Sequence, residues 1–166
     1  MHASKKPAKI MLAIVAEKVE LWRRLLEGHE LVFVMTLREA MLRLAEEDDL
    51  GLVIIGVHFD ESRMFTLLGD IRDHPKYRNI PVLVVLSPGQ YAFSPIAVEG
   101  IDRAVTALGA SGFLDLDQFP DNADGEARIR RIVDYVIAAG GDLPDIAREG
   151  ADPEVNRVIR RRDSKP

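Results

Sequence analysis

The stretch LVIIGVHFDESRMFTLLGDIR, residues 52–72, carries the pattern that decides the fold. It begins as an apolar run without polar alternation, which is typical of a strand buried on both faces. Apolar residues then recur at the spacing of one helical face, and this helix is expected to end at His74 because Pro75 follows. A buried strand that leads into a helix predicts one unit of a parallel sheet. The helical face consists of Phe65, Leu67, Leu68 and Ile71.

The same strand-then-helix pattern occurs five times along the chain. Five such units predict an α/β fold, a doubly wound five-stranded parallel sheet flanked by helices on both faces. The apolar runs lie at 10–15, 31–35, 50–57, 81–86 and 112–116. The other helical faces are Val19, Trp22, Leu25 and Leu26; Leu37, Ala40, Met41, Leu44 and Ala45; Ile101, Ala104, Val105 and Leu108; and Ile129, Ile132, Val133, Val136 and Ile137.

Length and composition favour one globular domain. The chain has 166 residues, of which 47% are hydrophobic and 30% charged, close to the average of soluble globular proteins. We expect a flexible N-terminus over 1–7, the domain over 8–139 and a tail over 140–166. The tail is rich in Gly, Pro and charge, and a short helix is expected over 153–162 with Asp152 as its N-cap.

The composition also excludes several classes of function. The absence of cysteine removes disulfides and thiolate metal sites, and no glycine-rich phosphate loop follows a strand. No apolar stretch approaches the ~20 residues of a membrane span. The net charge of -5 provides no broad basic surface, so nucleic-acid binding is not expected. We expect a cytoplasmic protein without cofactor or metal. Acidic neighbours balance the basic residues of the tail, which are Arg157, Arg160, Arg161, Arg162 and Lys165.

Three local strings resemble the receiver domain of bacterial two-component response regulators, which has a flavodoxin-like fold. Residues 52–72 resemble the third strand, active-site loop and third helix of that family. IPVLVVLS, residues 80–87, resembles the fourth strand, and ALGASGFLDL, residues 107–116, resembles the turn before the fifth strand and that strand. The helical periodicity extends the resemblance to about residue 139.

The family's chemistry rests on five side chains at the edge of the sheet where the strands end. An aspartate after the third strand accepts the phosphoryl group, and two acidic residues after the first strand hold magnesium. A hydroxyl residue and a lysine end the fourth and fifth strands and contact the phosphoryl oxygens. The cation is needed because an anionic carboxylate has to approach an anionic phosphate.

The resemblance places other residue types at these positions. Gly56 occupies the phospho-acceptor position and Leu116 the lysine position. Residues 14–16 end the first strand without a carboxylate, and Glu17 alone can stand in for the acidic pair. The chain has no aspartate before Asp48. We therefore expect no enzymatic activity and a phosphorylation-independent pseudo-receiver that acts through protein partners.

The sequence leaves two features of this edge open: which residue takes the hydroxyl position, and whether nearby carboxylates bind a cation. The hydroxyl position falls on Leu86 or, with a shift of one residue, on Ser87. Four carboxylates can also converge near the edge and bind a divalent cation. The favoured interpretation is that they are solvated or cap helices, with Asp60, Glu61 or Ser62 at the start of the third helix. The four carboxylates are those of Asp60, Glu61, Asp115 and Asp117.

The resemblance also implies where partners bind. In the family, the fourth helix, fifth strand and fifth helix form the face for a partner or a second copy. Phe113 corresponds to an aromatic residue whose rotation reports the active state. The loop aromatics Tyr91 and Phe93 can anchor a partner or fold onto the core, and both interpretations stay open. Candidate interface residues are Val98, Ile101, Val105, Phe113 and Tyr135.

Two other functions are weighed against the pseudo-receiver. A flavodoxin-like enzyme or ligand-binding protein would need a deep pocket at the same edge, with convergent polar groups such as those of Asp60, Ser87 and Asp115. A receiver regulated through an unconventional phosphosite would use His58 or Ser87. The sequence offers no coherent mechanism for the first and no activating partner for the second.

Overall fold

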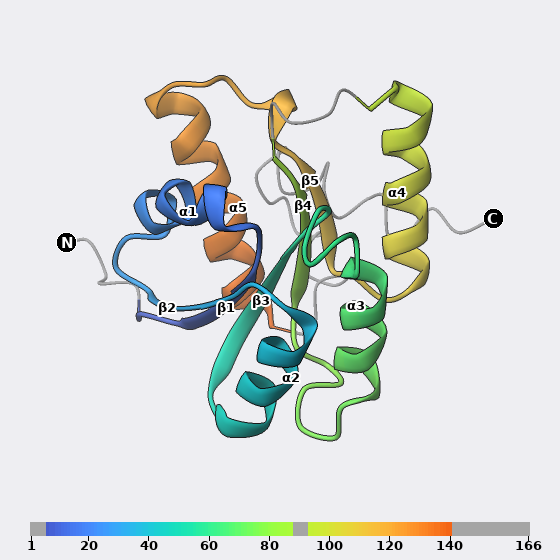
Figure 1. Cartoon of the computed structure of the whole chain (residues 1–166). Coiled ribbons are helices and arrows are strands. Elements are labelled where there is room, and N and C mark those ends of the chain that lie inside the picture. Colours follow the sequence, from blue (N-terminus) through green and yellow to red (C-terminus); the bar gives the residue numbers. More distant parts are fainter. Residues whose placement is uncertain (1–5, 88–92, 141–166) are drawn as a thin grey trace.

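The computed structural model describes residues 6–87 and 93–140 and contains a five-stranded parallel sheet (Figure 1). The strands follow the order β2-β1-β3-β4-β5, so β1 and β3 are neighbours and the chain crosses over between them. This confirms the predicted doubly wound fold. The strands are β1 (Lys9–Ala13), β2 (Glu30–Val34), β3 (Leu50–Gly56), β4 (Val82–Leu86) and β5 (Gly112–Asp115).

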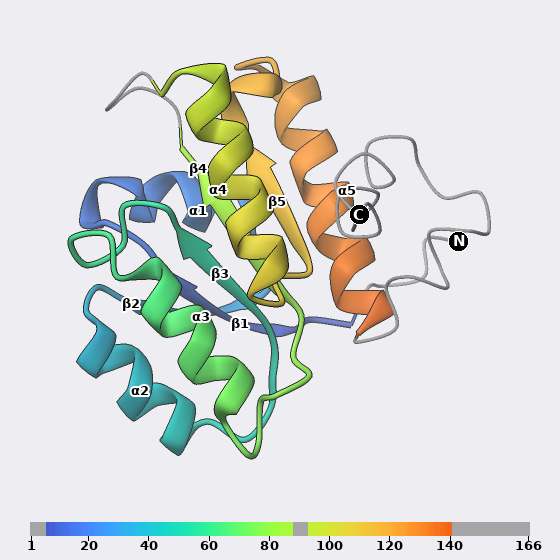
Figure 2. The same ribbon diagram turned by 90° about the vertical axis from the view of Figure 1, so that its right-hand side faces the viewer.

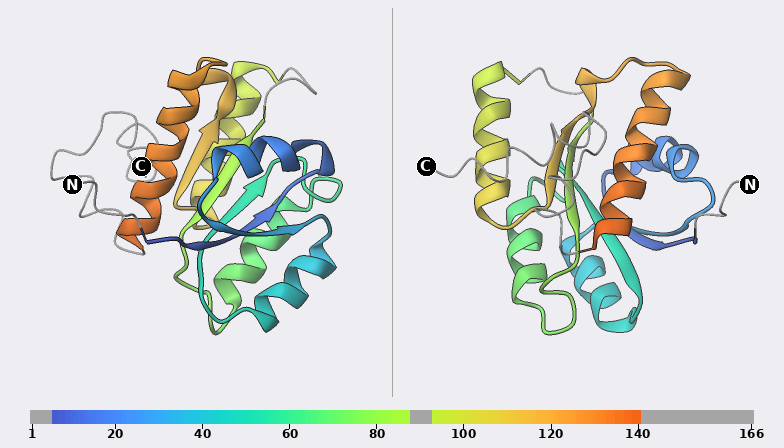
Figure 3. Two further views of the ribbon diagram at one scale, coloured as in Figure 1. Left: turned by 90° about the vertical axis from the view of Figure 1, so that its left-hand side faces the viewer. Right: turned by 180° about the vertical axis from the view of Figure 1, so that it is seen from behind.

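Helices cover both faces of the sheet (Figures 1 and 3). One face packs against α1 (Val19–Leu25) and α5 (Ala123–Ala139), and the other packs against three helices. Short 3-10 turns follow β1 and β5. The three helices are α2 (Leu37–Glu46), α3 (Met64–Asp73) and α4 (Pro95–Ala107), and the turns are η1 (Ala16–Lys18) and η2 (Leu116–Gln118).

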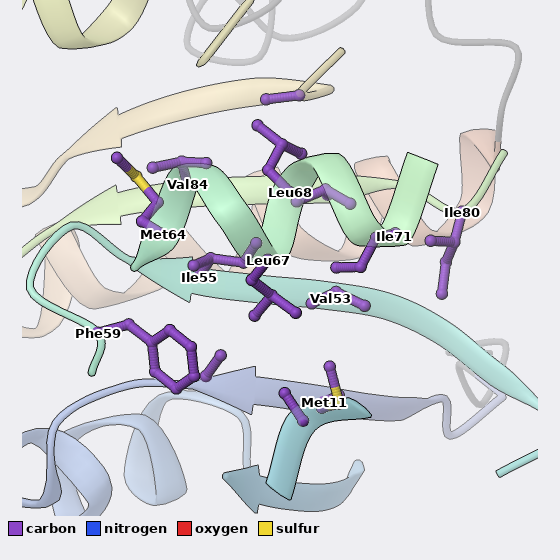
Figure 4. Packing of buried hydrophobic residues seen from close by; sticks show 14 of the residues in the cluster. Met11, Val53, Ile55, Phe59, Met64, Leu67, Leu68, Ile71, Ile80 and Val84 are labelled. Atoms are coloured by element: carbon purple, nitrogen blue, oxygen red, sulfur yellow. The ribbon is translucent and has the colours of Figure 1, made fainter. Parts of the chain in front are cut away.

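Each face of the sheet carries its own hydrophobic core, which explains the continuous apolar runs in the sequence. All five residues of β4 are buried, because helices cover both of its faces. Toward α3, the core contains Ile55, Leu67 and Phe59, with Leu67 beside Ile55 (Figure 4). Toward α1 and α5, it contains Trp22 and Val133. The inward side chains of the sheet thus fix which helix face packs on it.

Local sequence signals set several helix ends. Ser94 caps α4 by accepting from the Ala97 backbone N–H at 3.2 Å, and Pro95 is its first residue. α4 therefore begins well before Ile101, where the predicted apolar face begins. Asn122 caps α5 in the same way, with its side-chain oxygen 3.0 Å from the Gly125 nitrogen.

Some predicted details differ from the structure. Phe65 and Leu108 were predicted on buried helical faces, but they are 40% and 42% exposed. Phe65 lies on the flank of α3, where Met64 takes the buried position instead. The first strand ends at Ala13 rather than at residue 15, and β5 ends at Asp115, because Asp115 caps the following turn.

The predicted flexible N-terminus and the tail helix lie largely outside the described residues, as does Tyr91. Phe93 is described, and it is half-buried against the α2–α4 core with its ring stacked on His58 at 5.6 Å. This favours the interpretation in which Phe93 folds onto the core. Over 6–87 and 93–140, the structure contains no helix with the length and apolar character needed to cross a bilayer.

Candidate functional site

The strands end at one edge of the sheet, which we call the carboxyl edge, and Gly56 lies at its centre. Gly56 pairs with Val85 and borders a cavity of about 20 Å³. This space holds about one water molecule. The lining contains no carboxylate and is mostly apolar; it consists of Ile14, Val15, Lys18, Gly56, Val57, His58, Phe59, Val85 and Ser87.

Ile14 fills the space that faces the phospho-acceptor position. A Cβ added to Gly56 would lie 3.6 Å from Ile14 Cγ2, in ordinary van der Waals contact. Ile14 is only 2% exposed, and its backbone N–H donates to the Val34 carbonyl at 3.3 Å. An apolar side chain therefore takes the place that the family resemblance assigns to a cation ligand. A divalent cation there would lose water ligands and gain no oxygen from the side chain.

The acidic replacement suggested by the sequence does not reach this cavity. Glu17 is exposed in η1, while the neighbouring Lys18 lines the cavity. The ionisable side chains at the cavity are thus Lys18 and His58. A magnesium site needs negatively charged oxygen ligands, whereas the lysine cation here would repel a metal cation.

The two remaining receiver positions are also occupied by packing. Leu116 lies in η2, and its side chain is buried in the core between the sheet and helices α1 and α5. Leu86 points into the opposite core, whereas Ser87 lines the cavity beside Gly56. Of the two candidates for the hydroxyl position, the structure therefore brings Ser87 to the cavity.

The carboxylates near this edge serve local backbone groups instead of converging. Asp115 Oδ1 accepts from the Asp117 backbone N–H at 3.1 Å. Asp60 Oδ2 accepts from the Leu37 backbone N–H at 2.8 Å, and Glu61 is exposed. Across residues 6–87 and 93–140, no three His, Asp or Glu side chains are placed to hold a metal ion. Asp60, Glu61, Ser87 and Asp115 therefore do not form a common site.

The position of Asp60 differs from the predicted helix cap. It was expected at the start of α3 together with Glu61 or Ser62, but the N-cap of α3 is Arg63, without a side-chain hydrogen bond. Asp60 instead caps the start of α2, and a negative charge is favourable at that helix end. Residues 60–62 all have positive φ angles, from 42° to 69°, so the loop that carries this carboxylate is strained.

The structure divides the predicted interface residues between core and surface. Val105 and Phe113 belong to the core, with 0% and 4% exposure, so they are not available to a partner. They are buried because the sheet-facing side of α4 packs over β5. Val98 and Ile101 are half-buried against the same core, and Tyr135 is half-buried on the opposite face of the sheet. On α4, the most exposed large apolar side chain is Ile96, at 82%.

The opposite edge, where the strands begin, holds polar contacts that the sequence did not suggest; we call it the amino edge. His29 Nδ1 accepts from the Ala8 backbone N–H at 3.0 Å, and Nε2 lies 3.3 Å from Asp134 Oδ1. Because Nδ1 is an acceptor, the ring proton sits on Nε2 and points at the carboxylate. A cavity of about 210 Å³ lies beside this pair, next to Arg130 and Glu27.

Two lysines at the amino edge are surrounded by oxygen atoms. Lys9 Nζ lies 2.9 Å from carboxylate oxygens of Glu47 and of Asp49, and these hydrogen bonds raise the pKa of Lys9. Lys76 Nζ donates to Asp48 at 2.8 Å, which raises the pKa of Lys76 and lowers that of Asp48. A shallow cavity of about 540 Å³ lies beside Lys76 and Asp48. These partners are far apart in the sequence, so no local pattern announces them.

Arg72 connects three segments at the amino edge. Its Nε and Nη2 donate to the Gly109 carbonyl at 2.9 and 2.7 Å. Its Nη1 donates to the carbonyls of Ile80 and Arg78 at 2.6 and 3.1 Å. The guanidinium thus ties α3 to the start of β4 and to the turn before β5.

Comparison with solved structures places this architecture among receivers. A response regulator from Thermotoga maritima superimposes with a TM-score of 0.61 at 17% identity, over 80% of this chain and 99% of that chain. The receiver domain of a histidine kinase from Syntrophus aciditrophicus gives 0.60 at 20%, over 80% and 91%. A phosphorylated cyanobacterial phytochrome response regulator gives 0.58 at 19%, over 81% and 94%.

The sequence alone finds no such relatives. No family model matches the chain, and no curated protein does. At identities of 20% or less, the structural likeness concerns the fold. The chain has the fold of the receiver domains of two-component response regulators.

Proposed function

We propose that this chain is a pseudo-receiver, a protein-interaction module of two-component-type signalling that works without accepting a phosphoryl group. The observation that supports this most directly is the apolar cavity around Gly56. A bound phosphoryl group and its metal ion need oxygen and nitrogen ligands together with space. Here the acceptor carboxylate is absent, Ile14 fills the space that faces it, and the cavity measures about 20 Å³.

Partner binding is then the remaining role for the scaffold. The family resemblance suggests the face of α4, β5 and α5, for a partner protein or a second copy. On this face Ile96 is the exposed apolar anchor, and the half-buried Val98 and Tyr135 add contact area. Large apolar side chains at the centre of an interface supply most of its binding energy.

The competing functions find less support at the carboxyl edge. Ligand pockets usually measure ~300 to 1,000 Å³, well above the cavity beside Gly56. Ser87 borders the cavity, but no carboxylate in its lining can act as a base for it. His58 is half-buried and stacked on Phe93, which limits the approach of a phosphodonor to its ring.

The test is incubation of the full chain with acetyl phosphate and Mg²⁺, followed by intact mass measurement. We expect no phosphorylated species, while a phosphorylatable receiver treated in parallel is modified. Amide shifts with beryllium fluoride and Mg²⁺ provide a second measurement, and we expect no specific change around Gly56. A phosphoryl adduct on any residue would overturn the proposal, and its position would distinguish Ser87 from His58.

A gain-of-function variant sharpens the same test. Gly56→Asp restores the acceptor carboxylate, and its Cβ finds room beside Ile14. We still expect no phosphorylation, because the cation ligands and the lysine remain absent. Modification of Gly56→Asp would show that the rest of the site is competent, and the claim of a lost site would then reduce to one residue.

A further inference from the structure

The exposed apolar side chains of this domain are distributed unevenly over its surface. Within residues 6–87 and 93–140, the large apolar side chains classed as exposed all lie on α2, on α3, on α4 or directly after α4. None of them lies on α1 or α5. Exposed apolar side chains that gather on one side of a domain make that side a candidate binding surface. These residues are Leu42, Phe65, Ile96 and Leu108.

Two of these residues flank the surface where α3 and α4 face each other. Arg72 reaches the Gly109 carbonyl after α4, so the flank of α3 that carries Arg72 faces α4. Phe65 and Gly69 share that flank by their spacing of seven and three residues from Arg72. Figure 2 shows α3 and α4 side by side, running in the same direction on one face of the sheet.

The facing flank of α4 follows from the same geometry. Parallel neighbouring helices turn opposite flanks toward each other, which places the stripe of Ile101, Ala104 and Leu108 toward α3. These residues are half-buried or exposed. A Cβ added to Gly69 would meet no atom within 4 Å, so space remains above this glycine. We call Phe65, Gly69, Ile101, Ala104 and Leu108 the α3–α4 surface.

We propose that the chain's own C-terminal segment 153–162 docks on the α3–α4 surface as an amphipathic helix. Its sequence, PEVNRVIRRR, places Val155, Val158 and Ile159 at helical spacing among four arginines. A short apolar stripe of this kind suits a surface with small residues at its centre, since the backbones can approach closely.

Reach and charge support this occupant. α4 and α5 end at the same end of the molecule, on either side of β5 (Figure 2), so the described chain ends at the same end of the domain as Leu108. Residues 141–152 can span up to about 40 Å when extended, enough to cross a domain of this size. α3 also carries Asp73, which lies four residues after Gly69 and forms no ion pair within the described part of the chain, and the segment is basic.

A spin label tests the docking in the full chain. The sequence contains no cysteine, so Ser164→Cys gives a unique attachment site next to the segment. We expect loss of amide signal by paramagnetic broadening around Gly69 and around 101–109. Broadening on α1 or α5, or no localised broadening, would overturn the proposal.

Matched variants separate docking from chance proximity. Gly69→Gln fills the α3–α4 surface and is expected to abolish the broadening, whereas Ala138→Gln, at an exposed position of α5 on the other face of the sheet, should preserve it. Replacing Val155, Val158 and Ile159 with serine should abolish it too. If broadening appears only between labelled and unlabelled chains in a mixture, the occupant is a second copy and the intramolecular proposal fails.

Discussion

The two edges of the sheet use their side chains in opposite ways. At the carboxyl edge, where receivers carry out their chemistry, Ile14, Phe59 and Leu116 extend the hydrophobic cores to the ends of the strands. At the amino edge, Lys9, Lys76 and Arg72 hold neighbouring loops through charged and neutral oxygen atoms. The ends of the strands can be covered by apolar packing, while loop connections need polar partners because their backbone groups must be satisfied.

The largest effect is expected from a carboxylate at the carboxyl edge. Ile14→Asp buries a charge among apolar side chains and should lower the free energy of unfolding by about 4 kcal/mol at neutral pH. Burial raises the pKa of the new carboxyl above its unfolded value. The loss of stability should therefore shrink as the pH falls below this raised pKa and the buried carboxyl becomes protonated. Urea unfolding at several pH values measures both.

The control at this position is Ile14→Val, which removes one methyl group and should cost about 1 kcal/mol. If Ile14→Asp is instead as stable as the wild type and binds Mg²⁺, the carboxyl edge is a latent cation site rather than packed core.

The next effect concerns the polar amino edge. Arg72→Met removes the donors to the carbonyls of Gly109, Ile80 and Arg78 and should destabilise the fold by about 3 kcal/mol, because the partly buried acceptors of Gly109 and Ile80 are left unsatisfied. Arg72→Lys keeps the charge but loses the planar fork, so its loss should be intermediate. Equal losses for both variants would indicate that geometry matters more than charge, and no loss would show that these hydrogen bonds do not stabilise the fold.

A smaller effect is expected from the Lys76–Asp48 pair at the amino edge, which should make stability depend on pH in the acid range. Lys76 lowers the pKa of Asp48, so this carboxylate contributes stability above its ordinary pKa, and that contribution disappears as the pH falls through the lowered value. Asp48→Asn should therefore weaken the acid dependence of the urea midpoint, with little effect once the wild-type carboxyl is protonated. Because Asp48 is exposed, the change should be small. An unchanged acid dependence would contradict the pairing.

The same contrast explains what could be predicted from the sequence. Strands and helices followed from the apolar runs, since the period of each pattern depends only on neighbouring residues. Asp115 caps a turn two residues away, and such local caps are also visible in a sequence. That Gly56 and Leu116 occupy the positions of the receiver aspartate and lysine rests on the family resemblance and stays a prediction.

Contacts that depend on tertiary placement could not be predicted. Asp60 caps α2, 23 residues before it in the sequence, and His29 meets Asp134 from the other end of the domain. Of the five candidate interface residues, Val105 and Phe113 are buried, because a pattern of apolar residues does not show which of them the packing of α4 on β5 leaves exposed.

The smallest effect returns to the centre of the carboxyl edge. Gly56→Ala adds a Cβ that lies 3.6 Å from Ile14 Cγ2 and 3.7 Å from the Ala13 carbonyl oxygen, so the packing accepts it. Gly56 also lacks the positive φ that would require glycine. We expect a change within about 1 kcal/mol, toward higher stability, because alanine restricts the unfolded chain.

Gly125→Ala is the matched contrast for that measurement. Its added Cβ would fall directly on the Pro120 carbonyl, so this variant should unfold at clearly lower urea concentration than Gly56→Ala. If Gly56→Ala is the more damaging of the two, Gly56 is retained for backbone freedom at the carboxyl edge. The glycine at this position would then reflect a conformational requirement of β3, and not only the apolar packing around it.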